Sequence, residues 1–186
     1  MMNIFELIKS RRSIMPNQYN DKVILKDDII KILKAANWAP THKRTEPWRF
    51  KVLTGKKKEE LGLFLANKFK STASSFSEFK FEKIKNNANK ASVIIAICMQ
   101  RDVKQTLPEW EEIAAVAMAV QNMWLMATEL EIGAYWSSPN LISYANEFFD
   151  LEDKEVCLGF FYMGYYDTAP PEREPGGIEE KTTWLE

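Results

Sequence analysis

The chain has 186 residues, a length that suits one domain or one subunit of an intertwined dimer. Hydrophobic residues make up 46% of the sequence, which is enough for a packed core and too much for a disordered chain. Lys and Arg total 25 while Asp and Glu total 26, so the net charge of −1 gives no reason to expect a nucleic acid or an anionic membrane as a partner.

Residue types with strong chemistry of their own are scarce in this chain. Cys98 and Cys157 both lie in apolar segments, so we expect buried, reduced thiols in a cytoplasmic protein. The N-terminal residues follow a helical pattern and not that of a secretory signal. His42 is the one histidine, so we expect no His/Cys metal cluster, and the sequence has neither a P-loop nor a Gly-x-Gly-x-x-Gly motif. The classes of function that remain are chemistry carried by a cofactor, chemistry carried by carboxylates, and binding without catalysis.

The first expected helix runs from an N-cap at Asn3 to about Ser10, and Arg11-Arg12-Ser13 follows at its C-terminal end. Two arginines at that place can offset the negative end of the helix. Guanidinium groups beside a serine hydroxyl also suit a phosphate. The residues alone leave both interpretations open.

The segment from residue 27 to residue 99 alternates between helices and strands. We expect a helix over 27–38, a polar loop over 39–48, a strand over 49–54, a helix over 59–69, a serine-rich mobile loop over 71–77, a helix over 78–89 and a strand over 91–99. In the first strand, Phe50 and Val52 should be packed. The second strand reads ASVIIAICM, and so many β-branched residues in one apolar run indicate a central, buried strand.

A long hydrophobic helix is expected over about 109–131, and it organises the chain. Pro108 precedes a first turn rich in glutamate, and Gly133 provides a stop. No charged residue occurs from Ile113 to Thr128, so the helix should be buried on nearly all sides. The uncharged run is shorter than the roughly 20 residues that a membrane span needs. The helix is therefore either the centre of one domain or shared with a second copy of the chain.

Beyond this helix we expect a short strand over 134–136, a helix from Asn140, and a buried strand over 156–165. The tail, 167–186, cannot form a core of its own and ends in Trp184-Leu185, which suits packing on another surface. We predict one α+β domain over 1–186, with a small sheet flanked by helices, and a homodimer formed through the long helix.

Three polar clusters and one tail arginine lie between the buried elements. They are Arg11-Arg12-Ser13, Thr41 to Glu46, Trp136-Ser137-Ser138, and Arg173. Taken singly, each has a structural explanation: Trp136 suits a core, and the two serines suit a helix cap. Their order along the chain is what makes them informative.

In that order they resemble the FMN-dependent nitroreductase family, and most closely a compact branch with a histidine in the second loop. The matching segments are Arg11-Arg12-Ser13, Ala39 to Lys43, Glu46-Pro47-Trp48-Arg49-Phe50, Gly133 to Ser138, Leu158 to Gly164, and Arg173 with Lys181 to Trp184. Each motif is weak alone, but several in the right order over nearly the whole chain are fairly specific.

The resemblance implies a nitroreductase-like fold, a mostly antiparallel sheet, and an intertwined homodimer with FMN sites built by both subunits. It implies that Arg11, Arg12, Ser13 and Arg173 hold the FMN phosphate and ribityl oxygens. It implies further flavin contacts from two other segments, namely Trp38, His42 and Arg44 of the second loop, and Trp136, Ser137 and Ser138. The tail would wrap on the partner subunit.

Two residues depart from the family pattern. Arg44 and Glu46 stand where Asn and Gln are usual, which bears on the substrate side of the pocket more than on FMN. The expected activity is transfer of a hydride from NAD(P)H to FMN and on to a small-molecule acceptor, such as a nitroaromatic or quinone, by a ping-pong mechanism. The alternatives are a different FMN reaction on the same fold, either reductive dehalogenation or oxygen-dependent chemistry, and a cofactor-free helical dimer that binds a partner.

Overall fold

The computed structural model describes residues 3–168 and 170–185. The expected domain and tail also include residues 1, 2, 169 and 186, which lie outside the described residues. The fold is built on one four-stranded antiparallel sheet with the strand order β1-β2-β4-β3. The strands are β1 (Trp48–Leu53), β2 (Val93–Gln100), β3 (Gly133–Ser137) and β4 (Glu155–Gly164). This arrangement confirms the α+β prediction.

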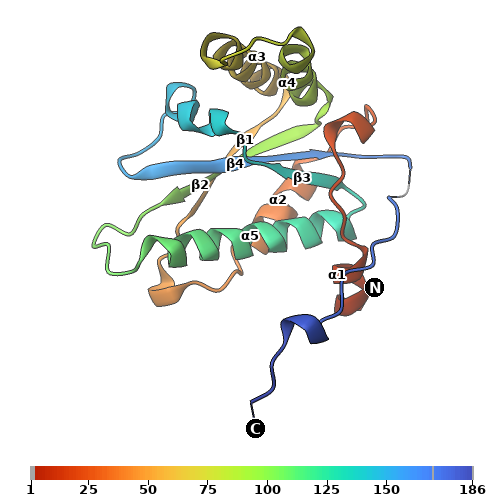
Figure 1. Cartoon of the computed structure of the whole chain (residues 1–186), viewed down its shortest axis with the longest axis vertical. Coiled ribbons are helices and arrows are strands. Elements are labelled where there is room, and N and C mark those ends of the chain that lie inside the picture. The colour runs from red at the N-terminus through yellow and green to blue at the C-terminus, as the bar shows by residue number, and fades with distance from the viewer. Residues whose placement is uncertain (1–2, 169, 186) are drawn as a thin grey trace.

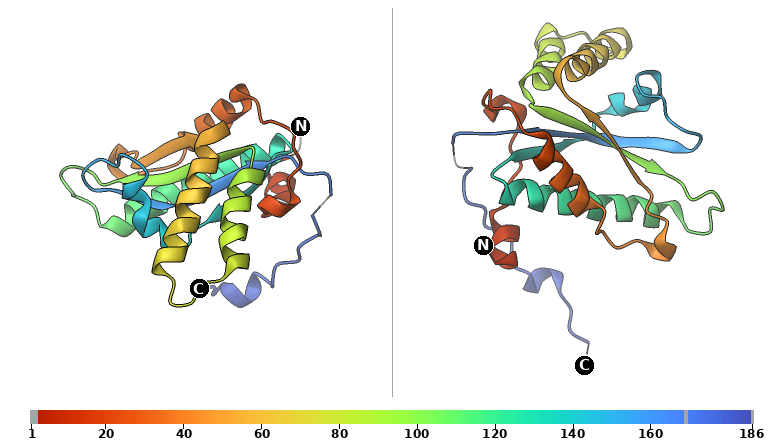
Figure 2. Two further views of the ribbon diagram at one scale, coloured as in Figure 1. Left: turned by 90° about the horizontal axis from the view of Figure 1, so that it is seen from above. Right: turned by 180° about the vertical axis from the view of Figure 1, so that it is seen from behind.

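Helices cover both faces of the sheet (Figure 1). The α-helices are α1 (Ile4–Ser10), α2 (Lys26–Ala36), α3 (Gly55–Thr72), α4 (Glu78–Lys90) and α5 (Glu109–Glu129). The short 3-10 helices are η1 (Pro16–Gln18), η2 (His42–Arg44), η3 (Asn140–Glu147) and η4 (Glu179–Lys181). Helices α2 and α5 lie on one face of the sheet, and the α3–α4 hairpin lies on the other (Figure 2).

The central strands separate two hydrophobic cores. Strand β2 is buried along nearly its whole length, as its continuous apolar sequence predicts. Ile95 and Ile97 face α2 and α5, while Ile94 and Ala96 face α3 and α4. This alternation follows from the two-residue period of a strand, so β2 supplies side chains to both cores.

Several local predictions need correction. Helix α2 stops at Ala36, so Trp38 leaves the helix and is 87% exposed. Helix α3 is longer at both ends than the predicted 59–69, because the lysines and glutamates that follow Gly55 are good helix formers. Val52, which lies in the edge strand β1 and was predicted to be packed, is 42% exposed. The predicted helix from Asn140 has the 3-10 form, and the Ser143 hydroxyl donates to the Asn140 carbonyl within it.

The long helix α5 is confirmed, but one of its faces is uncovered in the single chain. Ile113 is 39% exposed and Met118 is 41% exposed, while Val116, Val120 and Met123 are fully buried. The expected burial on nearly all sides therefore holds only for the side that packs on α2 and the sheet.

Helix α1 also presents apolar side chains to solvent, with Ile4, Phe5 and Ile8 exposed by 49–69%. Its N-cap is as predicted, since the Asn3 side chain accepts a hydrogen bond from the Glu6 amide. The tail extends away from the sheet and ends beyond α1 (Figure 1). Among the described residues, none of the helices is long and apolar enough to cross a membrane.

Candidate functional site

The Arg11-Arg12-Ser13 segment is held between α5 and the edge strand β3. Arg11 is the first residue after α1, and its guanidinium lies 4.7 Å from the centre of the Trp124 ring. The Trp124 indole N–H donates a hydrogen bond of 3.1 Å to the Arg12 carbonyl. Trp124 thus uses its ring face for one arginine and its N–H for the backbone of the next.

The tail reaches the same place. Arg12 donates from Nε to the Pro171 carbonyl at 3.0 Å, and from Nη1 to the Lys9 carbonyl at 2.6 Å. Arg173 follows two residues after Pro171. Burial and then the positive charges of Arg173 and Arg12 lower the pKa of Arg11 from its ordinary value. Three guanidinium groups from opposite ends of the chain therefore lie close enough to repel one another.

None of these arginines forms an ion pair with a carboxylate within the described residues. A phosphate would relieve their mutual repulsion and accept charge-assisted hydrogen bonds from them. An adjoining cavity of about 870 Å³ is lined by Arg12 and Arg173, and also by Glu6, Glu131 and Glu172. Lys9 also lines the cavity, so positive and negative side chains share it. Arg11, Arg12 and Arg173 are referred to below as the arginine cluster.

Ser13 places this segment against β3. Ser13 forms a parallel β-bridge with Ala134, and the Ile14 amide donates to the Ala134 carbonyl at 3.0 Å. Trp136 lies two residues further along β3 and therefore on the same face as Ala134. The arginine cluster, Ser13 and Trp136 thus line one edge of the molecule.

Trp136 rests on a glycine in the neighbouring strand. Its indole N–H donates to the Leu158 carbonyl at 3.3 Å. A Cβ at Gly159 would strike the Trp136 indole and would come within 2.6 Å of the Ser137 carbonyl. Gly159 also has a φ of +147°, which side chains rarely allow. Only glycine fits this position, and it fixes where the indole lies.

Ser137 and Ser138 do not share the position of Trp136. Ser137 lies on the opposite face of β3, where it lines a cavity of about 600 Å³ together with residues of α3 and α4. Ser138 follows the strand and is exposed. Trp136, Ser137 and Ser138 therefore do not form a single wall, because Trp136 and Ser137 lie on opposite faces of the end of β3.

The second loop lies at the other end of α5. His42 Nδ1 is 2.6 Å from Glu111 Oε2, near the start of the helix. Glu111 and Trp124 are 13 residues apart on α5, which corresponds to about 20 Å at 1.5 Å per residue. The single chain therefore does not bring His42 and Arg44, which both lie in η2, to the arginine cluster.

The backbone of this loop is unusual. Lys43, Arg44 and Glu46 all have positive φ, between 43° and 54°. Non-glycine residues seldom adopt this conformation, and when they do so they often lie at functional sites. The Trp48 indole closes the base of the loop by donating to the Asn37 side chain at 3.1 Å.

The glutamates at the start of α5 have structural partners. Arg101 Nε is 2.7 Å from the buried carboxylate of Glu112, and Arg101 also lies 3.6 Å from Glu109. These pairings leave carboxylate chemistry without support. No group of three or more His, Cys, Asp or Glu side chains suited to a metal occurs in the part of the chain that the structure describes.

Trp124 and Gly159 belong to this site but are not among the predicted flavin contacts. Trp124 lies in the apolar helix α5, where a tryptophan has a polar N–H that needs a partner. Gly159 was part of a matched motif, but a glycine inside an apolar strand is itself a signal of close approach by another group.

Comparison with known proteins identifies the family. The model of the nitroreductase family matches residues 8–165. "Putative NAD(P)H nitroreductase YfhC" of Bacillus subtilis is 28% identical over 182 residues, covering 96% of this chain and 92% of that protein.

Solved structures agree on the fold. A nitroreductase-like family protein of Bacillus cereus has a TM-score of 0.81 at 29% identity, covering 100% of this chain and 97% of the other. A Desulfovibrio desulfuricans protein, determined in complex with FMN, has a TM-score of 0.73 at 23% identity, with 100% and 98% covered. The fold is thus nitroreductase-like, and the chain belongs to the nitroreductase family, whose members are oxidoreductases.

Proposed function

We propose that this protein is an FMN-dependent oxidoreductase that takes a hydride from NAD(P)H and reduces a small-molecule acceptor. The observation that carries the proposal is the arginine cluster beside Trp124, Ser13 and Trp136 at the β3 edge. Family membership supports the same class of reaction.

The residues present fit FMN. Arg11, Arg12 and Arg173 would bind its phosphate, since their charges repel one another and have no carboxylate ion-pair partner among the described residues. Ser13 would donate its hydroxyl to phosphate or ribityl oxygens. Trp136 would form part of the wall against the ring, with Ser137 and Ser138 at its end.

The second half of the site would come from a partner subunit. If two chains pair through the exposed face of α5 in opposite directions, the start of one α5 lies beside the end of the other. This would carry Trp38, His42 and Arg44 of the partner subunit toward the arginine cluster. The exposed Ile113 and Met118, and the exposed apolar residues of α1, support such an interface. The tail, with Trp184 84% exposed, would pack on the partner.

Bound FMN would supply the redox chemistry, accepting electrons from NAD(P)H and passing them to the acceptor in ping-pong order. The protein would hold the ring, exclude excess water and keep positive charge nearby. Arg44 would supply charge near the ring, because it stands in the second loop where the family pattern has a neutral side chain. We assign no side chain as acid or base. The acceptors that we propose are nitroaromatics and quinones. We also propose a cytoplasmic location, where Cys98 and Cys157 would stay reduced.

The visible spectrum of the purified protein tests the proposal. We expect a flavin spectrum, restored by added FMN where occupancy is partial, and bleached anaerobically by NADH or NADPH. Addition of a nitroaromatic or quinone should restore the colour without oxygen. A colourless protein that does not bind added FMN would instead favour a cofactor-free binding module.

Reductive dehalogenation and oxygen-dependent chemistry on the same fold are distinguished by the second half-reaction. If the reduced protein is reoxidised rapidly by oxygen or a haloaromatic but not by a nitroaromatic or quinone, the acceptor class is wrong while FMN binding stands.

A further inference from the structure

The two cysteines of the chain face each other across β2 and β4. Cys98 and Cys157 are register partners in this antiparallel pair, next to an irregularity between Ile97 and Cys98. Both side chains pack in the core on the α3–α4 face, opposite to α5. Cys98 is fully buried and Cys157 is half-buried. The pair therefore lies outside the proposed flavin site.

The register places the two residues at a distance that a disulfide can span. Directly opposed residues of an antiparallel pair have Cα atoms about 4.5–5.5 Å apart. Disulfides accept about 4.4–6.8 Å. Both side chains belong to the core on the same face of the sheet, so they point to the same side.

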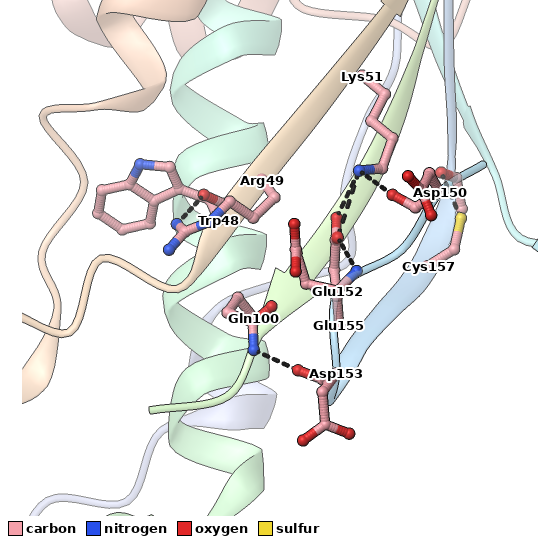
Figure 3. Close-up of polar contacts among 10 residues, drawn as sticks. Trp48, Arg49, Lys51, Gln100, Asp150, Glu152, Asp153, Glu155 and Cys157 are labelled. Carbon is pink, nitrogen blue, oxygen red and sulfur yellow. Dashed lines mark hydrogen bonds and ion pairs between the residues drawn. The ribbon is translucent and has the colours of Figure 1, made fainter. Parts of the chain in front are cut away.

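The surroundings make the two thiols unequal. The neighbouring Cys98 thiol lowers the pKa of Cys157, against the effect of burial. The neighbouring Cys157 thiol and burial both raise the pKa of Cys98. Cys157 Sγ also lies 3.6 Å from the Gly159 carbonyl. Figure 3 shows Cys157 beside the ion pair of Lys51 and Glu155, whose shortest N···O distance is 3.1 Å.

We propose that Cys98 and Cys157 are an oxidisable thiol pair that reacts with hydroperoxides and closes to an intrachain disulfide. Cys157 is the attacking thiol because it is the more accessible of the two. Cys98 is the resolving thiol, held in position by the strand register.

The reaction balances with one hydroperoxide per pair. The Cys157 thiolate attacks one peroxide oxygen, the O–O bond breaks, and Cys157 becomes a sulfenic acid while hydroxide (or alkoxide) leaves. Cys98 then attacks the Cys157 sulfur, the S–O bond breaks, the S–S bond forms, and water leaves. Two thiols lose two electrons in total, and hydrogen peroxide is reduced to two molecules of water.

The inference is independent of the proposed function, and alkylation followed by mass measurement tests it. The purified full-length protein is treated with one equivalent of hydrogen peroxide per chain, denatured and alkylated with N-ethylmaleimide. We expect the untreated chain to take up two labels, since it contains two cysteines. The treated chain should lose two mass units and take up none, and peptide mapping should show Cys98 joined to Cys157.

Two single variants separate the roles of the thiols. Cys98→Ser keeps the attacking thiol, so it should form a sulfenic acid that dimedone traps. Cys157→Ser keeps the buried thiol, which should react at least about tenfold more slowly. Circular dichroism confirms that each variant is folded, and the peptide map of the natural chain gives a result that needs no variant.

Three outcomes would overturn the proposal. Both thiols could stay fully alkylatable after the peroxide is consumed, the disulfide could form only between chains, or Cys157→Ser could react as fast as Cys98→Ser.

Discussion

Arg11 shows how one side chain links the proposed phosphate site to the core of the fold. Its guanidinium lies on Trp124, and Trp124 in turn packs edge-on against Phe161 at 5.5 Å. The arginine is therefore held in position before any ligand arrives, which limits the side-chain entropy lost on binding.

Replacing Arg11 by alanine should weaken FMN binding. Charge-assisted hydrogen bonds to phosphate contribute about 1.5–3 kcal/mol each, so losing one raises the dissociation constant about 10-fold to 150-fold. Fluorescence titration of FMN into the stripped protein measures the change. Lys57→Ala, which removes an exposed positive charge from α3, is the matched control and should bind FMN as the natural chain does. Equal affinity of the two variants would remove Arg11 from the phosphate site.

Gly159 is the second residue on which the site depends. A Cβ there would meet Trp136 and the Ser137 backbone in an unfavourable conformation. Gly159→Ala should therefore lower the free energy of unfolding by about 2–5 kcal/mol, combining backbone strain with overpacking. Gly55→Ala is the control, because Gly55 also has a positive φ of 49° but nothing within 4 Å of the added Cβ. It should cost about 1–2 kcal/mol, from strain alone. Urea unfolding compares them, and equal losses would show that close approach to Trp136 is unimportant.

Tyr19 links the first loop to β4, and its phenol couples stability to pH. Its hydroxyl lies 2.7 Å from the Ile14 carbonyl and 3.0 Å from the Tyr162 carbonyl. Burial, followed by the nearby Tyr162 and Tyr135, raises the pKa of Tyr19 well above its ordinary value. Above about pH 10 the unfolded chain loses this proton while the folded chain keeps it, so stability should fall as the pH rises.

Tyr19→Phe should lower stability at neutral pH and weaken the dependence of stability on pH in alkaline solution. At pH 7 it should lower the free energy of unfolding by about 1–3 kcal/mol, since buried carbonyls lose their donor. The ordinary tyrosine pKa is about 10. From about pH 10 to about pH 11.5, the free energy of unfolding of the variant should therefore decline less steeply than that of the natural chain. Denaturant unfolding at both ends of this range measures the free energy of unfolding. If that free energy falls with pH equally in the variant and the natural chain, the role of Tyr19 is contradicted.

At the scale of elements, α5 contacts different partners along its length and on its different faces. Its buried face fills the core with Val116, Val120 and Met123. Its first turn carries Glu111 toward His42, and its last turns carry Trp124 to the arginines. The remaining face is apolar and exposed, which is uncommon for a helix that serves only its own chain.

A charge on that face should disrupt association of the chains. Met118→Lys places an ammonium group on the exposed apolar side of α5, where burial in a dimer would be costly. Analytical ultracentrifugation should show a dimer for the natural chain and a dissociation constant raised at least about tenfold for the variant. Leu63→Lys on α3 is the control, since Leu63 is 48% exposed and lies on the opposite side of the sheet. If both variants associate like the natural chain, α5 is not the interface.

At the scale of the whole molecule, the sequence predicted the order of the helices and strands better than their exact lengths and helix types. The order of strands and helices is confirmed, because continuous apolar runs such as VIIAICM leave few alternatives to a central strand. The length of α3 and the 3-10 form of η3 were missed because local hydrogen bonding and propensity decide them, not hydrophobic period.

Parts of the site could not have been predicted from the residues alone. The sequence resemblance grouped Trp136 with Ser137, but the pleat of β3 turns them to opposite faces. Arg11 and Arg173 are distant in sequence, and only the fold brings the tail back to α1. The second loop was matched by its motif, yet its distance along α5 from the arginines is a property of the folded chain.

The separation along α5 of the arginine cluster from the second loop has a thermodynamic consequence if the proposed two-chain flavin site is correct. A flavin held by groups from two chains binds the pair and not the single subunit, so cofactor affinity and subunit association share one free energy. Each would then stabilise the other by the same amount. Dilution of the protein would release the flavin even at an unchanged flavin concentration, and loss of flavin would loosen the pair. The number of working sites in a cell would accordingly rise more steeply than the number of chains, because two chains are needed before either holds a flavin.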